Sequence, residues 1–191
     1  MSHLEQRIRD ISKKYKLSHV GSCLSVLPIL EEIYSNKAPE DLVILDNAHS
    51  HLAHLVIREQ YEDLQDIERL LTDVGIHCDR KAGCDVSGGS LGHGIGIAIG
   101  LALGRMKRTI HVIVSDGSMM EGSNWEALRV RSSMGLTNIR IYCNFNGFSA
   151  VQEVDRKLLE FRMRQFIGDA TYYWTDNGEG LEGLEGHYKV I

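Results

Sequence analysis

The spacing of apolar side chains along the chain predicts helices that alternate with short strands. Between residues 3 and 16, Leu4, Ile8 and Ile11 recur every three or four positions, as on the buried stripe of an amphipathic helix. Apolar runs such as 109–115 lack this period and indicate buried strands. Helices are predicted at 3–16, 22–35, 62–71, 90–104, 122–134 and 155–166, strands at 42–45, 109–115, 139–143, 170–174 and 188–191, and a loop at 73–90.

This alternation predicts an α/β fold with a mostly parallel sheet flanked by helices, because strand–helix–strand units build parallel sheets. We expect one domain over residues 1–191, since no linker or internal repeat interrupts the pattern. Ligands of such sheets bind beyond the carboxyl ends of the strands. The expected binding segments are therefore 46–49, 115–122 and 144–149, and Asp46 or Asn47 is expected to cap the helix that follows.

Composition and charge exclude several classes of protein. Of 191 residues, 43% are hydrophobic and 25% are charged, with a formal net charge of −5. The acidic balance argues against a nucleic-acid partner, and no apolar stretch is long enough for a membrane span. The amino-terminal segment has no apolar signal region, and the 4 cysteines include no CxxC pair. We therefore expect a cytoplasmic protein with reduced thiols and no structural zinc site.

Glycine is abundant where proline is scarce, with 19 glycines against 2 prolines. Gly92, Gly96 and Gly100 repeat every four positions in the predicted helix at 90–104. Such a stripe would leave one helix face bare, so that another backbone or a ligand can approach closely.

Two polar segments follow neighbouring predicted strands and suit a metal ion. Asp116 and Gly117 follow 109–115, and Asn146 follows 139–143 after 30 positions, which is the length of one strand–helix–strand crossover. A carboxylate and an amide oxygen are thus expected at the same sheet edge, where they suit Mg²⁺ or Ca²⁺. Gly117 would let a diphosphate approach the backbone. Alternatively, Asp-Gly and Asn-Gly only form the turns that close the two strands.

Five ordered segments resemble motifs of the transketolase family. SDGSMMEGSNWEA followed by NFNG resembles the family's thiamine diphosphate motif, in which Gly-Asp-Gly precedes a Glu-Gly and an Asn ends the next strand. The other four segments are SHVG, DNAHS, GIHCD and SGGSLGHGIGIAIGLALG. The resemblance covers residues 10–165 and implies a three-layer thiamine diphosphate-binding fold, that of the family's N-terminal domain.

The resemblance also implies an activity and roles for individual residues. The implied reaction transfers a two-carbon ketol unit between sugar or sugar-phosphate substrates. His19 and His77 would face the substrate, and Glu121 would join an acidic network between the cofactor sites of a dimer. The implied catalytic residues are His19, His77 and Glu121. The implied cofactor-binding residues are His49, Gly89, Leu91, Asp116, Gly117 and Asn146. The implied ligands of Mg²⁺ or Ca²⁺ are Asp116, Asn146 and the backbone carbonyl of Phe148.

The chain departs from the family pattern in ways that imply a partner. Ser115 replaces the first glycine of Gly-Asp-Gly, Val20 and Cys78 replace prolines, and Phe145 stands where an acidic residue or asparagine is usual. The family's pyrimidine-binding domain has no counterpart, and His187 is the candidate for a further histidine near the diphosphate. We therefore expect a separate C-terminal transketolase-like subunit that completes a dimer or heterotetramer.

Two other interpretations stay open at the level of sequence. A degenerate homologue would bind a partner without turnover. A serine hydrolase would use Ser90 within Gly88–Gly92, which matches G-x-S-x-G and requires a strand directly before the serine. His49, His51 and His54 form an H-x-H-x-x-H pattern, but helix positions 49 and 51 point to different sides, so one metal ion does not easily use all three.

Overall fold

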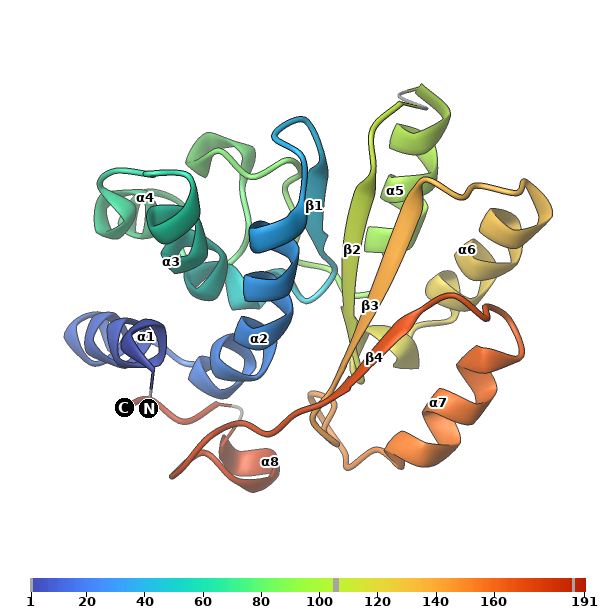
Figure 1. Cartoon of the computed structure of the whole chain (residues 1–191). Coiled ribbons are helices and arrows are strands. Elements are labelled where there is room, and N and C mark those ends of the chain that lie inside the picture. The colour runs from blue at the N-terminus through green and yellow to red at the C-terminus, as the bar shows by residue number, and fades with distance from the viewer. Residues whose placement is uncertain (1, 105–106, 187) are drawn as a thin grey trace.

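The sheet of the computed structural model is fully parallel and positions one polar edge. The structure describes residues 2–104, 107–186 and 188–191, and in these residues four strands pair in the order β1–β2–β3–β4. Every neighbouring pair is parallel, with Val114 beside Cys143. The carboxyl ends of the strands therefore lie along one edge (Figure 1). The strands are β1 (Leu42–Leu45), β2 (Ile110–Ser115), β3 (Ile139–Phe145) and β4 (Thr171–Trp174).

Helices cover both faces of the sheet and complete three layers (Figure 1). The first layer holds α1 (His3–Tyr15), α2 (Val20–Asn36), α3 (His51–Tyr61) and α4 (Ile67–Val74). The layer on the other face holds α5 (Gly94–Gly104), α6 (Gly122–Ser133) and α7 (Arg156–Arg164). Shorter turns are η1 (Ala48–Ser50), η2 (Arg80–Ala82), η3 (Ser118–Met120) and α8 (Gly183–Gly186). The predicted α/β fold with a parallel sheet is confirmed.

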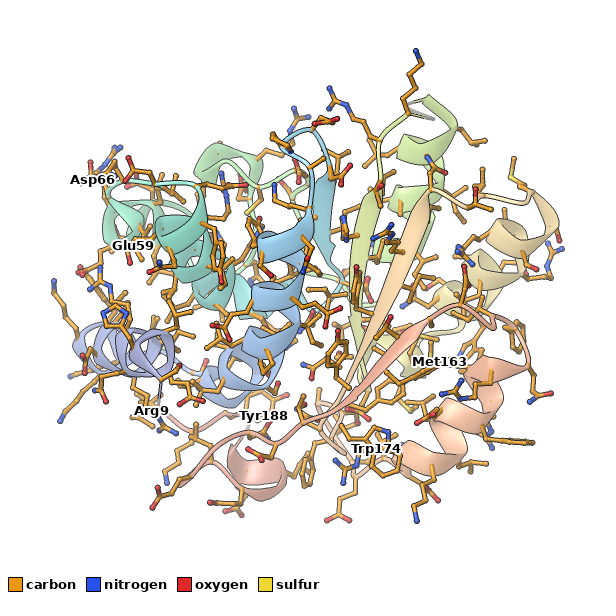
Figure 2. The ribbon with its side chains drawn as sticks, in the orientation of Figure 1. Arg9, Glu59, Asp66, Met163, Trp174 and Tyr188 are labelled. Carbon is orange, nitrogen blue, oxygen red and sulfur yellow. The ribbon has the colours of Figure 1, made fainter. Side chains whose placement is uncertain are left out.

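Each helical layer packs on its own hydrophobic core. Ile113 of β2 belongs to the core under α1–α4, whereas Val112 and Val114 belong to the core under α5–α7. Successive side chains of a strand point to opposite faces, so one short apolar strand supplies both cores. Met163 of α7 is fully buried in the second core (Figure 2). β1 and β2 are therefore buried on both faces, and Asp46 and Asp116, which directly follow them, lie at the carboxyl edge.

Helix boundaries differ from the prediction where the backbone turns left-handed. α4 begins at Ile67 rather than at 62, because the N–H of Glu62 closes α3 on the Arg58 carbonyl and Asp63 has a φ of 53°. α5 begins at Gly94 rather than at 90, and Gly92 before it has a φ of 87°. Both conformations are incompatible with a continuous right-handed helix.

The predicted strand at 188–191 is wrong, whereas the expected bare glycine face is observed in α5 at Gly96 and Gly100. The described residues 188–191 form no strand. An ideal Cβ at Gly96 or Gly100 has no atom within 4 Å, so the glycine face of α5 is open within the described part of the chain. Across the described ranges, no helix combines the length and apolar character that a membrane crossing requires.

Candidate functional site

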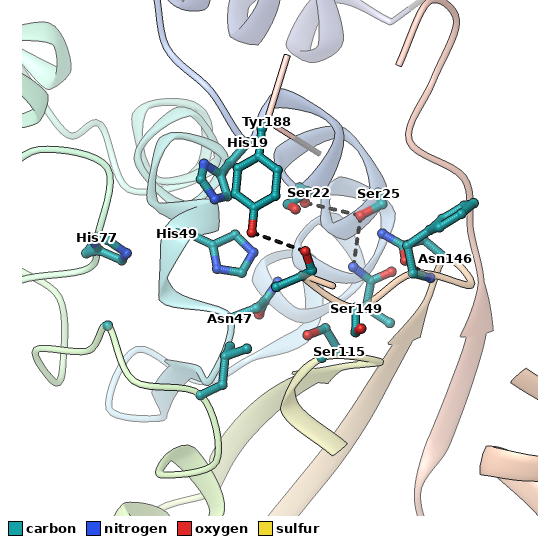
Figure 3. A pocket seen from close by; sticks show the side chains of 16 residues that line it. His19, Ser22, Ser25, Asn47, His49, His77, Ser115, Asn146, Ser149 and Tyr188 are labelled. Carbon is teal, nitrogen blue, oxygen red and sulfur yellow. Dashed lines mark hydrogen bonds between the residues drawn. The ribbon is translucent and has the colours of Figure 1, made fainter. Parts of the chain in front are cut away.

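A pocket of about 190 Å³ lies at the carboxyl edge of the sheet (Figure 3). Its walls come from the start of α2, from the segments that follow β1, β2 and β3, and from the loop before α5. Parallel strands end at one edge, so these segments converge although they are distant in sequence. The sequence-predicted residues in its wall are His19, His49, His77, Gly89, Leu91, Gly117, Asn146 and Phe148.

Asp116 is fully buried beside this wall. Its Oδ2 accepts hydrogen bonds from the backbone N–H groups of Asn146 (2.7 Å) and Gly147 (3.2 Å). Its Oδ1 has no hydrogen-bond partner among the described residues. Burial raises the pKa of Asp116 from 3.8 to about 7, although the two backbone hydrogen bonds act in the opposite direction. A buried carboxylate oxygen without a partner is costly, and a bound cation would remove that cost.

Asn146 forms the turn that meets Asp116. Its Oδ1 accepts a hydrogen bond from the Phe148 N–H (3.0 Å), and its Nδ2 donates to Asn177 Oδ1 (2.8 Å). The expected meeting of residues 116 and 146 at one sheet edge is therefore observed, through the Asn146 backbone. The sequence did not single out Asn177, which lies beyond β4 and is also buried.

Three histidines stand on one side of the pocket (Figure 3). His19 precedes α2 with a φ of 63°, and its Nδ1 lies 2.7 Å from Ser18 Oγ. Its ring centroid is 5.0 Å from that of His49 and 5.4 Å from that of Tyr188. His77 reaches the pocket from the loop before α5. Imidazoles placed in this way can orient hydroxyl groups and move protons near neutral pH.

Two glycines of the pocket wall leave space that a larger side chain would occupy. An ideal Cβ at Gly117 would lie 3.3 Å from Leu91 Cδ1, and one at Gly89 would lie 3.8 Å from His77 Cδ2. A larger side chain at either position would enter space next to pocket residues. Both glycines thus leave the backbone accessible to a ligand.

Asp46 holds the segment that carries Leu91, and the expectation that Asp46 or Asn47 caps the next helix is wrong. Neither the turn at Ala48 nor α3 has a side-chain cap. Asp46 Oδ2 instead accepts hydrogen bonds from the Gly92 N–H (2.9 Å) and from Asn124 Nδ2 (3.0 Å), and Oδ1 accepts from the Gly94 N–H. The carboxylate therefore satisfies donors at the start of α5, which lies far ahead in the sequence.

The residues that line the pocket differ in part from those predicted from the sequence. Glu121 is exposed at the start of α6 and does not line the pocket, and His187 lies outside the described residues. A sequence signal existed for Ser22 and Ser25, which interrupt an otherwise apolar helix three positions apart. Four pocket residues fall within the expected binding segments 46–49, 115–122 and 144–149: Asn47, Ser115, Asn144 and Ser149. The pocket residues that sequence reasoning missed are Ser22, Ser25, Ala150 and Tyr188.

The geometry contradicts a serine hydrolase. Ser90 is exposed and follows a loop, with no strand in the described residues directly before it. A nucleophile elbow needs a strand-to-helix turn that projects the serine above the sheet. The G-x-S-x-G match at 88–92 is therefore fortuitous.

The sequence and the structure of this chain are similar to those of transketolases and of a related synthase. Residues 2–175 match the family model described as 1-deoxy-D-xylulose-5-phosphate synthase. A 6-deoxy-6-sulfo-D-fructose transketolase subunit from Clostridium sp. (strain MSTE9) is 27% identical across 91% of this chain and 68% of its own length. An apulose-4-phosphate transketolase subunit from Actinobacillus succinogenes is 41% identical across 32% of this chain and 24% of its own. The solved transketolase from Leishmania mexicana matches with a TM-score of 0.67 at 20% identity, over 85% of this chain and 31% of that one. The chain thus spans only part of the length of these proteins.

Proposed function

The chain belongs to the family of 1-deoxy-D-xylulose-5-phosphate synthase and transketolase N-terminal domains, and we propose that it is the N-terminal subunit of a split transketolase-like enzyme. Members of this family generally use thiamine diphosphate. The proposed reaction transfers a two-carbon ketol unit between sugar or sugar-phosphate substrates. The cofactor would supply the carbon–carbon bond chemistry, while the protein binds it, orients it and moves protons.

The observation that carries this proposal is the buried Asp116 Oδ1 that lacks a partner among the described residues at the edge of the pocket. Its chemistry fits Mg²⁺ or Ca²⁺, which prefer carboxylate and carbonyl oxygens. Asp116, the Asn146 amide oxygen and the Phe148 carbonyl would be the protein ligands. Mg²⁺ usually takes its other ligands from water and substrate phosphates, and here the cofactor diphosphate would provide them.

The pocket wall divides into a proposed cofactor side and a proposed substrate side. Gly117, Gly89, Leu91 and His49 would lie along thiamine diphosphate, and the accessible backbone at the two glycines supports this assignment. His19 and His77 would orient the hydroxyl groups of a sugar-like substrate and carry protons, since imidazoles titrate near neutral pH. The exposed position of Glu121 is compatible with an acidic network that a second protomer completes.

A second polypeptide would supply the pyrimidine-binding half. Two relatives support this part of the proposal, because each is named as one subunit of a transketolase. We expect the complete assembly to be a dimer or heterotetramer. We also place it in the cytoplasm, an assignment supported by four buried cysteines that form no disulfide.

The metal assignment predicts weaker cofactor binding for Asn146→Ala. Thiamine diphosphate with Mg²⁺ is titrated calorimetrically into the chain alone and into its complex with a pyrimidine-domain subunit. We expect Mg²⁺-dependent affinity to fall about tenfold or more, as for other losses around a metal site. Asn138→Ala is the matched control, because Asn138 precedes β3 at the opposite end of the strand and bonds the Arg108 carbonyl.

Two outcomes would contradict parts of the proposal. Equal binding by wild type and Asn146→Ala in the complex would remove Asn146 from the metal site. An absence of binding by wild type, alone and with its partner, would instead favour the degenerate homologue that assembles without turnover.

A further inference from the structure

A second polar cluster lies inside the core between α3 and the loop that precedes α5. His54, Cys78 and Cys84 are all buried, and their ligand atoms lie within 4.8 Å of one another. His54 Nδ1 is 4.0 Å from Cys78 Sγ and 3.8 Å from Cys84 Sγ. None of the three lines the pocket described above. The oxygen ligands expected for Mg²⁺ are absent from this set, which consists of sulfur and nitrogen.

A candidate fourth ligand is on the same helix, outside the group of three whose ligand atoms lie within 4.8 Å of one another. His51 precedes His54 by three positions on α3 and is fully buried. Its Nδ1 lies 3.1 Å from the Gly75 carbonyl oxygen, and its Nε2 has no hydrogen-bond partner within the described part of the chain. A carbonyl oxygen only accepts, so Nδ1 carries a proton, and in the neutral ring the lone pair is then on Nε2. The neutral His51 ring would therefore offer a ligand nitrogen in the protein interior.

We propose that His51, His54, Cys78 and Cys84 bind one structural zinc ion, or an ion of the same class. Two thiolates and two imidazoles are a common tetrahedral set for zinc. With both histidines neutral, two thiolates balance the charge of the ion, so the buried site carries no net charge.

The outer partners of both histidines match those of metal ligands. Ligating histidines usually bond their other ring nitrogen to a second group, which fixes the ring. His54 Nε2 lies 2.6 Å from the buried Tyr34 hydroxyl, and His51 Nδ1 bonds the Gly75 carbonyl. In each ring the remaining nitrogen is thus the one left for the ion.

The local backbone brings the two cysteines together although five residues separate them. Asp79 caps the short η2 turn at its start, and Gly83 ends the turn with a φ of 77°. The Cys84 N–H then donates to the Asp79 carbonyl (3.2 Å) and closes the loop. The spacing lacks a CxxC signature, which explains why the sequence alone argued against a structural zinc site.

The electrostatics of the cluster favour a thiolate. A hydrogen bond with Cys78 lowers the pKa of the Cys84 thiol far below its ordinary value despite burial, and His51 and His54 act in the same direction. The same contact and burial raise the pKa of Cys78 well above its usual value, and burial does the same for Cys143. Reactive or ligating cysteines are generally the ones held as thiolates.

The ion would fasten the loop that carries His77 to α3. Cys78 follows His77 directly, its N–H donates to the Ala48 carbonyl (3.0 Å), and its carbonyl accepts from the Gly88 N–H (2.9 Å). A ligand bond at Cys78 would therefore hold both His77 and the neighbouring Gly89 in position. The proposal is independent of the thiamine diphosphate assignment, because it concerns different residues and a different metal class.

Metal content of the purified full chain tests the proposal directly. The protein is prepared in reducing buffer without chelators, and bound metals are measured by mass spectrometry. We expect about one zinc per chain. Replacement by Co²⁺ is expected to give the visible bands of tetrahedral coordination and a thiolate-to-cobalt charge-transfer band. Cys84→Ala and His54→Ala should lose the metal, and Cys143→Ala is the matched control that should retain it.

Three results would overturn the proposal. One is wild-type protein that contains no zinc and takes up none from an equimolar solution under reducing conditions. Another is an intact Cys78–Cys84 disulfide in that reduced preparation. The third is full zinc occupancy in folded Cys84→Ala. If a cluster variant does not fold, the stoichiometry and cobalt spectrum of the wild type decide the question alone.

Discussion

Asp116→Asn is expected to stabilise the cofactor-free protein at alkaline pH while it abolishes Mg²⁺-dependent binding of thiamine diphosphate. Asparagine can still accept the backbone hydrogen bonds from Asn146 and Gly147 through its amide oxygen. It cannot ionise, so the variant avoids a buried charge. The same change removes the one anionic ligand proposed for the metal, and the ion would then lack its main electrostatic attraction.

The sign of the pH dependence follows from the raised pKa of Asp116. The folded protein holds this proton up to about pH 7, whereas the unfolded chain loses it near the ordinary value of 3.8. Between these values the folded state binds more protons, so the stability of the metal-free protein falls as pH rises. The full cost above neutrality is at most about 4 kcal/mol. Wild type and Asp116→Asn should therefore match near about pH 4 and diverge by a few kcal/mol near about pH 8.

Urea unfolding in chelator at both pH values measures this difference. Asp41→Asn is a control of opposite sign. Burial alone would raise the pKa of Asp41, but hydrogen bonds from the backbone N–H groups of Thr109 and Ala38 and the nearby His111 ring lower it below its ordinary value. That variant should be less stable than wild type at about pH 8. A wild-type pH profile identical to that of Asp116→Asn would show that Asp116 does not titrate near neutrality.

Features that depend on residues close together in the chain could be predicted from the sequence. The period of apolar residues in α1 and the short apolar run of β2 depend on neighbours in the chain, so both were recognisable. The pairing of Asp116 with Asn146 was predictable because one crossover unit fixes the distance between two parallel strand ends. The predicted starts of α4 and α5 were wrong, because Asp63 and Gly92 adopt left-handed backbone conformations that a helix cannot include.

Contacts that cross the chain were beyond sequence reasoning. Tyr188 lies beside the His19 ring, and its hydroxyl donates to the Ala150 carbonyl (3.2 Å), although nothing near residue 188 signals a pocket. Cys84 meets His54 only because the η2 turn folds back on α3. In each case the partner is fixed by tertiary packing rather than by a local period or motif. The family resemblance supplied the candidate pocket residues, but it could not supply these neighbours.

Asp46→Ala is expected to have the largest effect on stability of any single change in this edge of the sheet. It would leave the buried N–H groups of Gly92 and Gly94 without a side-chain acceptor. It would also remove one of the two hydrogen bonds that Asn124 Nδ2 donates, while the bond to the Ser118 carbonyl would remain. Alanine cannot reach these donors, and water has little access because Asp46 and Asn124 are both buried. Each buried donor left without an acceptor costs about 1–3 kcal/mol, so the two backbone N–H groups predict a loss of about 2–6 kcal/mol.

This carboxylate has two roles, and they can be separated by measurement. Urea unfolding reports its effect on the fold, for which Asp10→Ala is the matched control, because exposed Asp10 bonds the neighbouring Gln6 side chain and should change stability by about 0.5 kcal/mol or less. Below the unfolding transition, calorimetric titration of thiamine diphosphate with Mg²⁺ reports whether the segment from Leu91 to Gly94 stays in place. If Asp46→Ala unfolds at the same urea concentration as Asp10→Ala, then Asp46 does not hold the start of α5. A folded Asp46→Ala protein with weakened cofactor binding would place its main role in the pocket wall, since Leu91 directly precedes Gly92 and lies against the Gly117 side of the pocket.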